Sequence, residues 1–194
     1  MQIGFVSTRL AGTDGVSLET TKWSDVLAAL GHLCFYFAGE IDRPPERSYV
    51  VPEAHFEHPE IRALSEALFG RKSRSHDTSR TVQRLKEHLK SHLYHFVDSF
   101  DLDLLIVENA LAIPMNVPLG LALTEFIAEV GMRTIGHHHD FAWERPRFWP
   151  NAALDYLRGA FPPTFPSIQH VVINSIARDQ LALRRKVQAM LIPN

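Results

Sequence analysis

Residues 1–40, MQIGFVSTRLAGTDGVSLETTKWSDVLAALGHLCFYFAGE, decide the fold class. The apolar run at residues 2–6 predicts a strand, and the turn-forming residues that follow it predict a loop. Apolar residues then recur at helical spacing between Ser17, a predicted N-cap, and Gly31, which follows the last turn. Residues 32–40 predict a second buried strand. This order of strand, loop, helix and strand builds parallel sheets, with a right-handed crossover.

The rest of the chain continues the alternation of strands and helices. Residues 101–109, DLDLLIVEN, are a continuous apolar run, which is typical of a central strand buried on both faces. The sequence therefore predicts one Rossmann-like, doubly wound α/β domain with a mainly parallel sheet of about six strands and helices on both faces. The other predicted strands lie at residues 47–56, 133–138 and 168–175, and the other helices at 59–70, 77–99, 118–130, 151–161 and 176–190.

Composition places the chain among ordinary soluble globular proteins. Of its 194 residues, 45% are hydrophobic and 22% are charged, and the formal net charge is −2. These values exclude a disordered chain and do not favour a nucleic-acid partner. The single cysteine, Cys34, lies in an apolar run and predicts a buried thiol in a reducing compartment. No stretch resembles a membrane span or a signal peptide, so we expect a cytoplasmic location.

One segment is locally basic. Seven lysines and arginines lie between Arg71 and Lys90, and only Asp77 and Glu87 oppose them. The plainer interpretation is the solvated face of a helix. The alternative is a patch that binds an anionic ligand or a membrane surface.

Three predicted loops lie at the carboxyl edge of the sheet, where doubly wound folds bind ligands. The first contains Gly12 and Gly15 just before a helix, so its backbone N–H groups can approach a phosphate or a sugar oxygen. It lacks the dinucleotide-binding glycine pattern, and a nicotinamide cofactor is not indicated. The second loop begins at Glu108 and Asn109, and the third contains the histidine run.

The histidine run, residues 137–139, is open to three interpretations. If the strand continues through it, His137 and His139 share one side and His138 faces the other. His137, His139 and Asp140 could ligate a metal, although no known zinc spacing is present. The histidines could instead cap the strand by hydrogen bonding. The interpretation that we favour is contact with a sugar hydroxyl, with Asp140 fixing the orientation of the imidazole.

Two arginines follow the histidine run on a loop that contains proline. Arg145 and Arg147 could meet a carboxylate or a phosphate of a ligand. Arg147 together with Phe148 could instead cover the core.

Three stretches together resemble a known family. They are AGTDGVSLETTKWSDVLAALGH at residues 11–32, HHHDF at residues 137–141, and VINSIARDQLALRRKVQAMLIPN at residues 172–194. In this order and spacing they resemble the N-terminal domain of GT-B glycosyltransferases, in particular glycosyltransferase family 4. The resemblance extends over essentially the whole chain.

The resemblance implies half of an enzyme. The N-terminal domain of a GT-B enzyme holds the acceptor, and a second domain, which contains paired glutamates and is absent from this chain, holds the nucleotide-sugar donor. The chain ends where the linker into that domain would begin, so we expect this half alone to be inactive. The resemblance also implies transfer with retention of configuration, without a metal or other cofactor.

The resemblance assigns roles to a few residues. It places Gly12 and Gly15 on a flexible loop near the donor phosphates and the acceptor, and it places His139 near the transferred sugar. His138 is the alternative, because the triple histidine run leaves the register ambiguous. Topology alone places Glu108, Asn109, Arg145 and Arg147 around the acceptor. Two other functions remain open, a sugar- or phosphate-binding domain without catalysis and a metal-dependent hydrolase that uses His137, His139 and Asp140.

Overall fold

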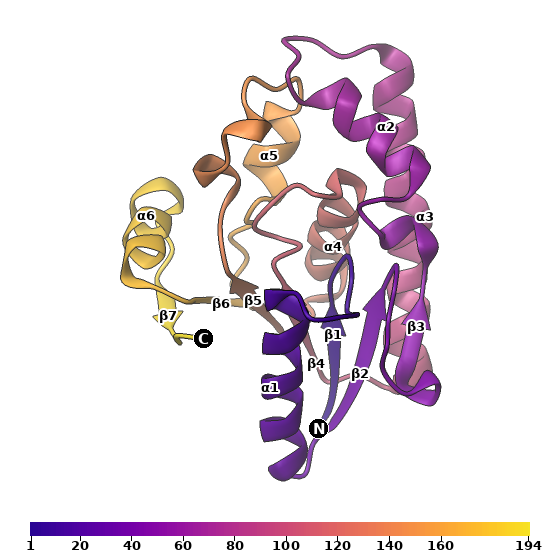
Figure 1. The fold of residues 1–194 in the computed structure, drawn as a ribbon, viewed down its shortest axis with the longest axis vertical. Coiled ribbons are helices and arrows are strands. Elements are labelled where there is room, and N and C mark those ends of the chain that lie inside the picture. The colour runs from indigo at the N-terminus through magenta and orange to yellow at the C-terminus, as the bar shows by residue number, and fades with distance from the viewer.

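The computed structural model describes residues 1–194 and contains one sheet of seven parallel strands. The strand order is β3-β2-β1-β4-β5-β6-β7, so the chain winds outward in one direction from β1 and in the other from β4 (Figure 1). This order confirms the predicted Rossmann-like α/β fold, with seven strands in place of about six. The strands are β1 (Gln2–Val6), β2 (Leu33–Ala38), β3 (Ser48–Val50), β4 (Leu104–Glu108), β5 (Thr134–His138), β6 (Ile168–Val172) and β7 (Ala189–Leu191).

Helices pack against both faces of the sheet (Figure 1). The α-helices are α1 (Gly15–Ala29), α2 (Pro59–Leu68), α3 (His76–Phe100), α4 (Val117–Val130), α5 (Leu154–Ala160) and α6 (Ser175–Arg185). Four short 3-10 helices complete the chain, η1 (Pro45–Arg47), η2 (Pro52–Ala54), η3 (Ala142–Glu144) and η4 (Pro146–Phe148).

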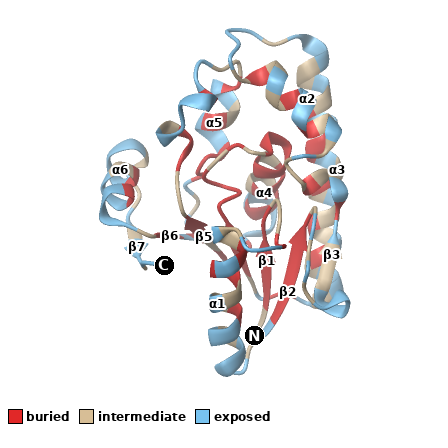
Figure 2. Cartoon of the chain, viewed as in Figure 1, coloured by how far each residue is buried: buried red, intermediate tan, exposed pale blue.

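The two faces of the sheet contribute to separate apolar clusters. On one face, side chains of β1, β2 and β4 pack with Trp23 and Leu27 of α1. On the opposite face, the alternate side chains of the same strands pack with α3 and α4 and form the largest cluster, which includes Phe37, Phe96 and Phe126. Buried residues therefore concentrate in the central strands and in α4 (Figure 2). This double coverage explains the continuous apolar run of β4.

The first helix begins earlier than the sequence analysis predicted. Asp14, not Ser17, is the N-cap of α1, and its carboxylate accepts hydrogen bonds from the backbone N–H groups of Val16 and Ser17. The Ser17 hydroxyl donates to the same carboxylate at 2.8 Å. Aspartate and serine are both favoured N-cap residues, and here the one closer to β1, Asp14, is the N-cap. The loop after β1 is therefore shorter than predicted.

The C-terminal segment differs more from the prediction. Helix α6 ends at Arg185 because Lys186 adopts a left-handed conformation with φ of 58°. The Arg185 guanidinium donates to the carbonyls of Leu157 and Phe161. Residues 189–191 then form β7, which pairs in parallel with β6. The predicted helix over residues 176–190 is thus a helix followed by an edge strand.

The basic segment is largely neutralised by ion pairs. Arg74 pairs with Asp155, and Lys86 pairs with Glu125. Lys90 contacts Glu125 and also Glu129, at 2.9 Å each. Arg80 and Arg84 also have acidic partners. The structure therefore favours a paired, solvated helix face over a patch for anionic ligands or membranes. None of the helices has the length and apolar character needed to cross a bilayer.

Candidate functional site

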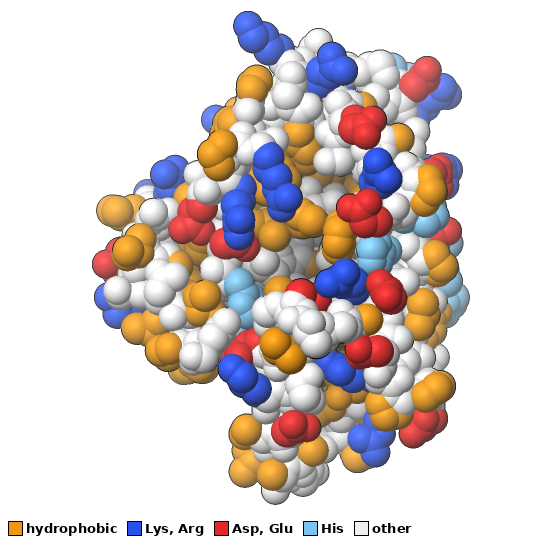
Figure 3. All heavy atoms as spheres, viewed as in Figure 1, with side chains coloured by type: hydrophobic (Ala, Val, Ile, Leu, Met, Phe, Trp, Pro, Cys, Tyr) orange, Lys and Arg blue, Asp and Glu red, His pale blue; other side chains and the backbone are white.

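A pocket opens at the carboxyl edge of the sheet, between β1 and β4. Its volume is about 210 Å³, and the loops after these two strands form most of its wall. The winding direction reverses between these strands, which is the position where doubly wound folds bind ligands. Figure 3 shows a hollow near the middle of this face, with charged side chains of both signs around it. The polar lining residues are Ser7, Thr8, Arg9, Asp14, Glu108 and Asn109.

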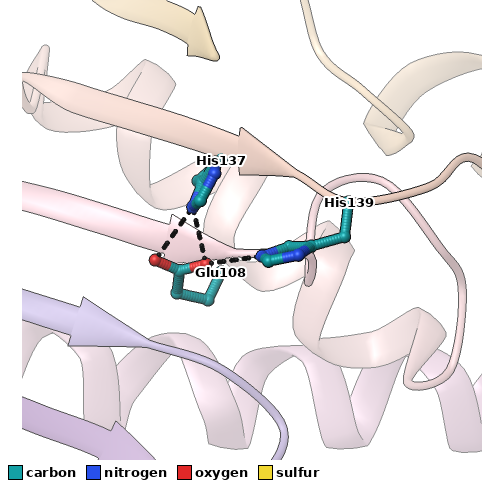
Figure 4. A group of neighbouring side chains, drawn as sticks. All are labelled: Glu108, His137 and His139. Carbon is teal, nitrogen blue, oxygen red and sulfur yellow. Dashed lines mark hydrogen bonds and ion pairs between the residues drawn. The ribbon is translucent and has the colours of Figure 1, made fainter. Parts of the chain in front are cut away.

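Glu108 at the end of β4 is completely buried and forms the centre of the site (Figure 4). His137 Nδ1 lies 3.0 Å and 3.2 Å from its two carboxylate oxygens. His139 Nε2 lies 3.2 Å from the oxygen Oε2. The predicted alternation of the histidine run is confirmed, because His137 and His139 both turn towards Glu108.

The histidines hold the Glu108 carboxylate in its charged form. Burial raises the pKa of Glu108, but the hydrogen bonds and charges of His137 and His139 outweigh burial and lower its pKa below the ordinary value. A carboxylate can only accept, so His137 Nδ1 and His139 Nε2 both donate. The amide of Asn194 lies 3.3 Å from the other ring nitrogen of His139, Nδ1.

The same three side chains have the geometry of a metal site. One ligand atom each of Glu108, His137 and His139 lies within 4.8 Å of the other two. Glu108 therefore takes the place that the sequence analysis gave to Asp140. The two imidazoles donate hydrogen bonds to the carboxylate, and the ring of Trp23 in α1 lies tilted against that of His137, with ring centroids 4.7 Å apart. Hydrogen bonding thus accounts for the carboxylate of Glu108, whereas Nε2 of His137 is buried without a partner.

Asp140 orients a different part of the site. It accepts a hydrogen bond from Asn109 Nδ2 at 2.8 Å and forms an ion pair with Arg145. Asn109 also accepts from the backbone N–H of His139 at 3.2 Å. Asp140 therefore acts on His139 through Asn109 and the backbone, whereas the sequence analysis expected it to contact the imidazole.

His138 is not brought to the site. It is fully buried on the opposite face of the sheet, where its Nε2 lies 2.8 Å from Nδ1 of His170. The ring of Phe141 lies against it. A ligand in the pocket beside Glu108 does not reach His138, so the geometry favours His139 over His138 as the sugar-contacting histidine.

The glycine loop lies beside the pocket, and its backbone is anchored. Gly12 has φ of 78°, and its N–H donates to the carboxylate of Asp42 at 2.7 Å. A side chain at Gly12 or Gly15 would meet no atom within 4 Å, so both positions are open to a ligand. Asp14 between them lines the pocket and pairs with Arg9 at 2.8 Å.

Sequence reasoning missed several pocket residues. Ser7, Thr8 and Asp14 belong to the predicted first loop but were not singled out. Phe56 and Met115 form the apolar wall and come from loops far apart in the sequence. The preference of aspartate for the N-cap position was a signal by which Asp14 could have been found. No local pattern could have indicated Phe56.

A second hollow, with a volume of about 260 Å³, shares Phe56 and Met115 with the first. Arg147 lines this second hollow. Arg145, the other predicted arginine, lines neither and is held by Asp140.

The fold and the pocket together define a Rossmann-like α/β domain with a candidate ligand pocket at the point where the sheet reverses its winding. No family model matches the chain. Over its whole length, the chain is 31% identical to mannosylglucosylglycerate synthase of Petrotoga mobilis and 31% identical to mannosylglucosylglycerate synthase of Thermotoga maritima. It spans 45% of the length of each of these relatives, which are glycosyltransferases.

A solved structure supports the fold. Sucrose-phosphate synthase from Thermosynechococcus elongatus superposes with a TM-score of 0.59 over 99% of this chain and 47% of that protein. The sequence identity is 14%, so this likeness concerns the architecture alone. The chain thus has glycosyltransferase relatives, of which it corresponds to a little less than half.

Proposed function

We propose that the chain is the acceptor-binding half of a retaining glycosyltransferase, the N-terminal domain of a GT-B enzyme of family 4. The acceptor occupies the pocket between β1 and β4, and a second domain supplies the nucleotide-sugar donor. The observation that carries the proposal is the position of Glu108, which lines this pocket and also binds His139. The alignment with glycosyltransferases over the whole chain supports it.

The pocket has the chemistry that an acceptor sugar requires. Hydroxyl groups both donate and accept hydrogen bonds, and the lining offers the hydroxyl of Thr8 and the hydroxyl oxygen of Ser7, whose own O–H donates to the carbonyl of Glu108. Phe56 and Met115 supply the apolar wall against which the C–H face of a sugar ring can pack.

In this proposal His139 contacts the transferred sugar. Its side chain is 12% exposed and contacts Glu108, which lines the acceptor pocket. Glu108 fixes the tautomer of His139 by accepting from Nε2. The chain thus contributes positioning and electrostatic stabilisation, and the transfer needs no bound metal. The buried thiol of Cys34 is compatible with the cytoplasm as its location.

The complete enzyme provides the test of His139. The substitution His139→Ala removes the contact to the transferred sugar, and we expect transfer to fall about a hundredfold or more, as for other preorganised electrostatic groups. The measurement is the initial rate of sugar transfer with saturating donor and acceptor. His76→Ala, at an exposed position at the start of α3, is the matched control and should transfer normally. Near-normal turnover by a folded His139→Ala enzyme would overturn the assignment.

A further inference from the structure

The second hollow extends the acceptor pocket away from Glu108. The two hollows share the side chains of Phe56 and Met115, so a ligand can extend from one into the other over this apolar wall. The first hollow offers groups suited to hydroxyls. The second is bordered by charged side chains, namely Arg62 and Arg147 with Glu57 and Glu66.

Arg147 differs from its neighbours because it lacks an acidic partner. Arg62 lies 3.7 Å from Glu57, and Arg145 is paired with Asp140. Arg147 lies within 4 Å of no carboxylate, although two line the same hollow, and its only hydrogen-bond contact is the sulfur of Met115. A thioether is a weak acceptor, so most of the five donors of this guanidinium are free to bind a ligand.

The orientation of Arg147 is fixed by packing. Its guanidinium carbon lies 4.8 Å from the centroid of the Phe148 ring. Phe148 is buried and held in turn by the ring of Phe69, at a centroid distance of 4.9 Å. Stacking on an aromatic ring engages the face of a guanidinium and leaves its N–H edge free for two parallel hydrogen bonds to an anion.

We propose that the acceptor carries an anionic group, a carboxylate or a phosphate, which binds to Arg147 while the hydroxyl-bearing part of the molecule occupies the pocket at Glu108. This inference rests on the proposed acceptor role of the chain and adds the charge of the acceptor to it. Arg147 is then the residue that determines specificity for acidic acceptors, and Arg145 has the structural role of holding Asp140.

The experiment is calorimetric titration of the 194-residue chain with two matched pairs of ligands. Glucosylglycerate and glucosylglycerol differ in a carboxylate, and fructose 6-phosphate and fructose differ in a phosphate. We expect one acidic ligand to bind roughly tenfold or more tightly than its neutral partner, because hydrogen bonds to charged groups are the stronger ones. The pair that shows the difference identifies the anion.

Variants identify the residue responsible. In Arg147→Gln the preference for the acidic ligand should disappear while the affinity for the neutral ligand stays the same. Arg133→Gln, at an exposed arginine before β5 that has no ion pair, should keep the full preference. Circular dichroism confirms that both variants are folded.

The outcomes separate this inference from the proposed function. Equal affinity within both pairs would overturn the role of Arg147 and leave the acceptor role intact. A preference for the acidic ligand that persists in Arg147→Gln would likewise overturn the role of Arg147 and leave the acceptor role intact. Failure of all four ligands to bind would overturn both.

Discussion

His138 and His170 form a buried pair on the sheet face opposite the pocket. Their facing nitrogens are 2.8 Å apart, and the other nitrogen of each ring has no partner. Burial lowers the pKa of His138 well below its ordinary value and lowers that of His170 to about 4. Both rings are therefore neutral in the folded protein near pH 7, and one N–H donates to the other ring.

This pair makes the fold sensitive to acid. In the unfolded chain each histidine binds a proton below about pH 6.5, but in the folded chain His170 stays neutral down to about pH 4. The unfolded state then binds more protons, so the free energy of unfolding falls by up to about 1.4 kcal/mol per histidine for each pH unit below 6.5. His170→Gln should reduce this slope between pH 6.5 and 5, as measured by urea unfolding at several pH values.

The matched control is His76→Gln, because His76 is exposed at the start of α3. This variant should keep the slope of the wild-type chain. If His170→Gln unfolds with the same pH slope as the wild-type chain, the buried pair is not the source of acid sensitivity.

At the same scale, the sequence predicted which histidines share a side but not which groups they meet. Strand alternation is a property of the local backbone, and it placed His137 and His139 correctly. The partner of both is Glu108, on the neighbouring strand, and this depends on the register between β4 and β5. Asp140 follows the strand end, where alternation no longer determines direction, and it turns to Asn109 and Arg145 instead.

At the scale of the elements, helix α4 and the chain after α5 are in very close contact at Gly120. A Cβ atom there would lie 2.2 Å from the ring of Phe161. Gly159 in α5 provides the contrast, because a Cβ atom there would meet nothing within 4 Å. The first glycine is required by packing, whereas the second only adds flexibility to a helix.

The two glycines should therefore respond in opposite ways to alanine. Gly120→Ala should lower the free energy of unfolding by roughly 1–3 kcal/mol, because the buried aromatic ring must move. Gly159→Ala should raise it by about 0.5–1 kcal/mol, because alanine restricts the unfolded chain. Urea unfolding midpoints measure both, and equal shifts of the same sign would contradict the packing described for Gly120.

Most elements could be predicted from periodicity, but β7 could not. A three-residue edge strand has too few residues for a pattern, and residues 186–190 continued the apparent helix in sequence. The helix ends because Lys186 adopts a left-handed backbone conformation and the Arg185 side chain donates hydrogen bonds to distant carbonyls. The hydrogen bonds of Arg185 are tertiary contacts, which a local sequence pattern does not reveal. The N-terminal boundary of α1 was wrong by a few residues because two good capping residues lie close together.

At the scale of the whole molecule, the topology gathers the site from distant parts of the chain. The alternation of strands and helices predicted the parallel sheet, and the sheet predicted that the loops after β1 and β4 would meet. It did not predict Phe56 or Met115, because they reach the pocket through irregular segments whose course depends on packing. It also did not distinguish Arg145 from Arg147, which follow each other closely and differ in what surrounds them.

The measurement that tests the acceptor role most directly is titration of the 194-residue chain with both substrates of a glycosyltransferase. The acceptor is represented by glucosylglycerate, and the donors by UDP-glucose and GDP-mannose, each followed by calorimetry under the same conditions. We expect saturable binding of the acceptor, with the nucleotide sugars bound at least tenfold more weakly. Tight binding of a nucleotide sugar without binding of the acceptor would contradict it.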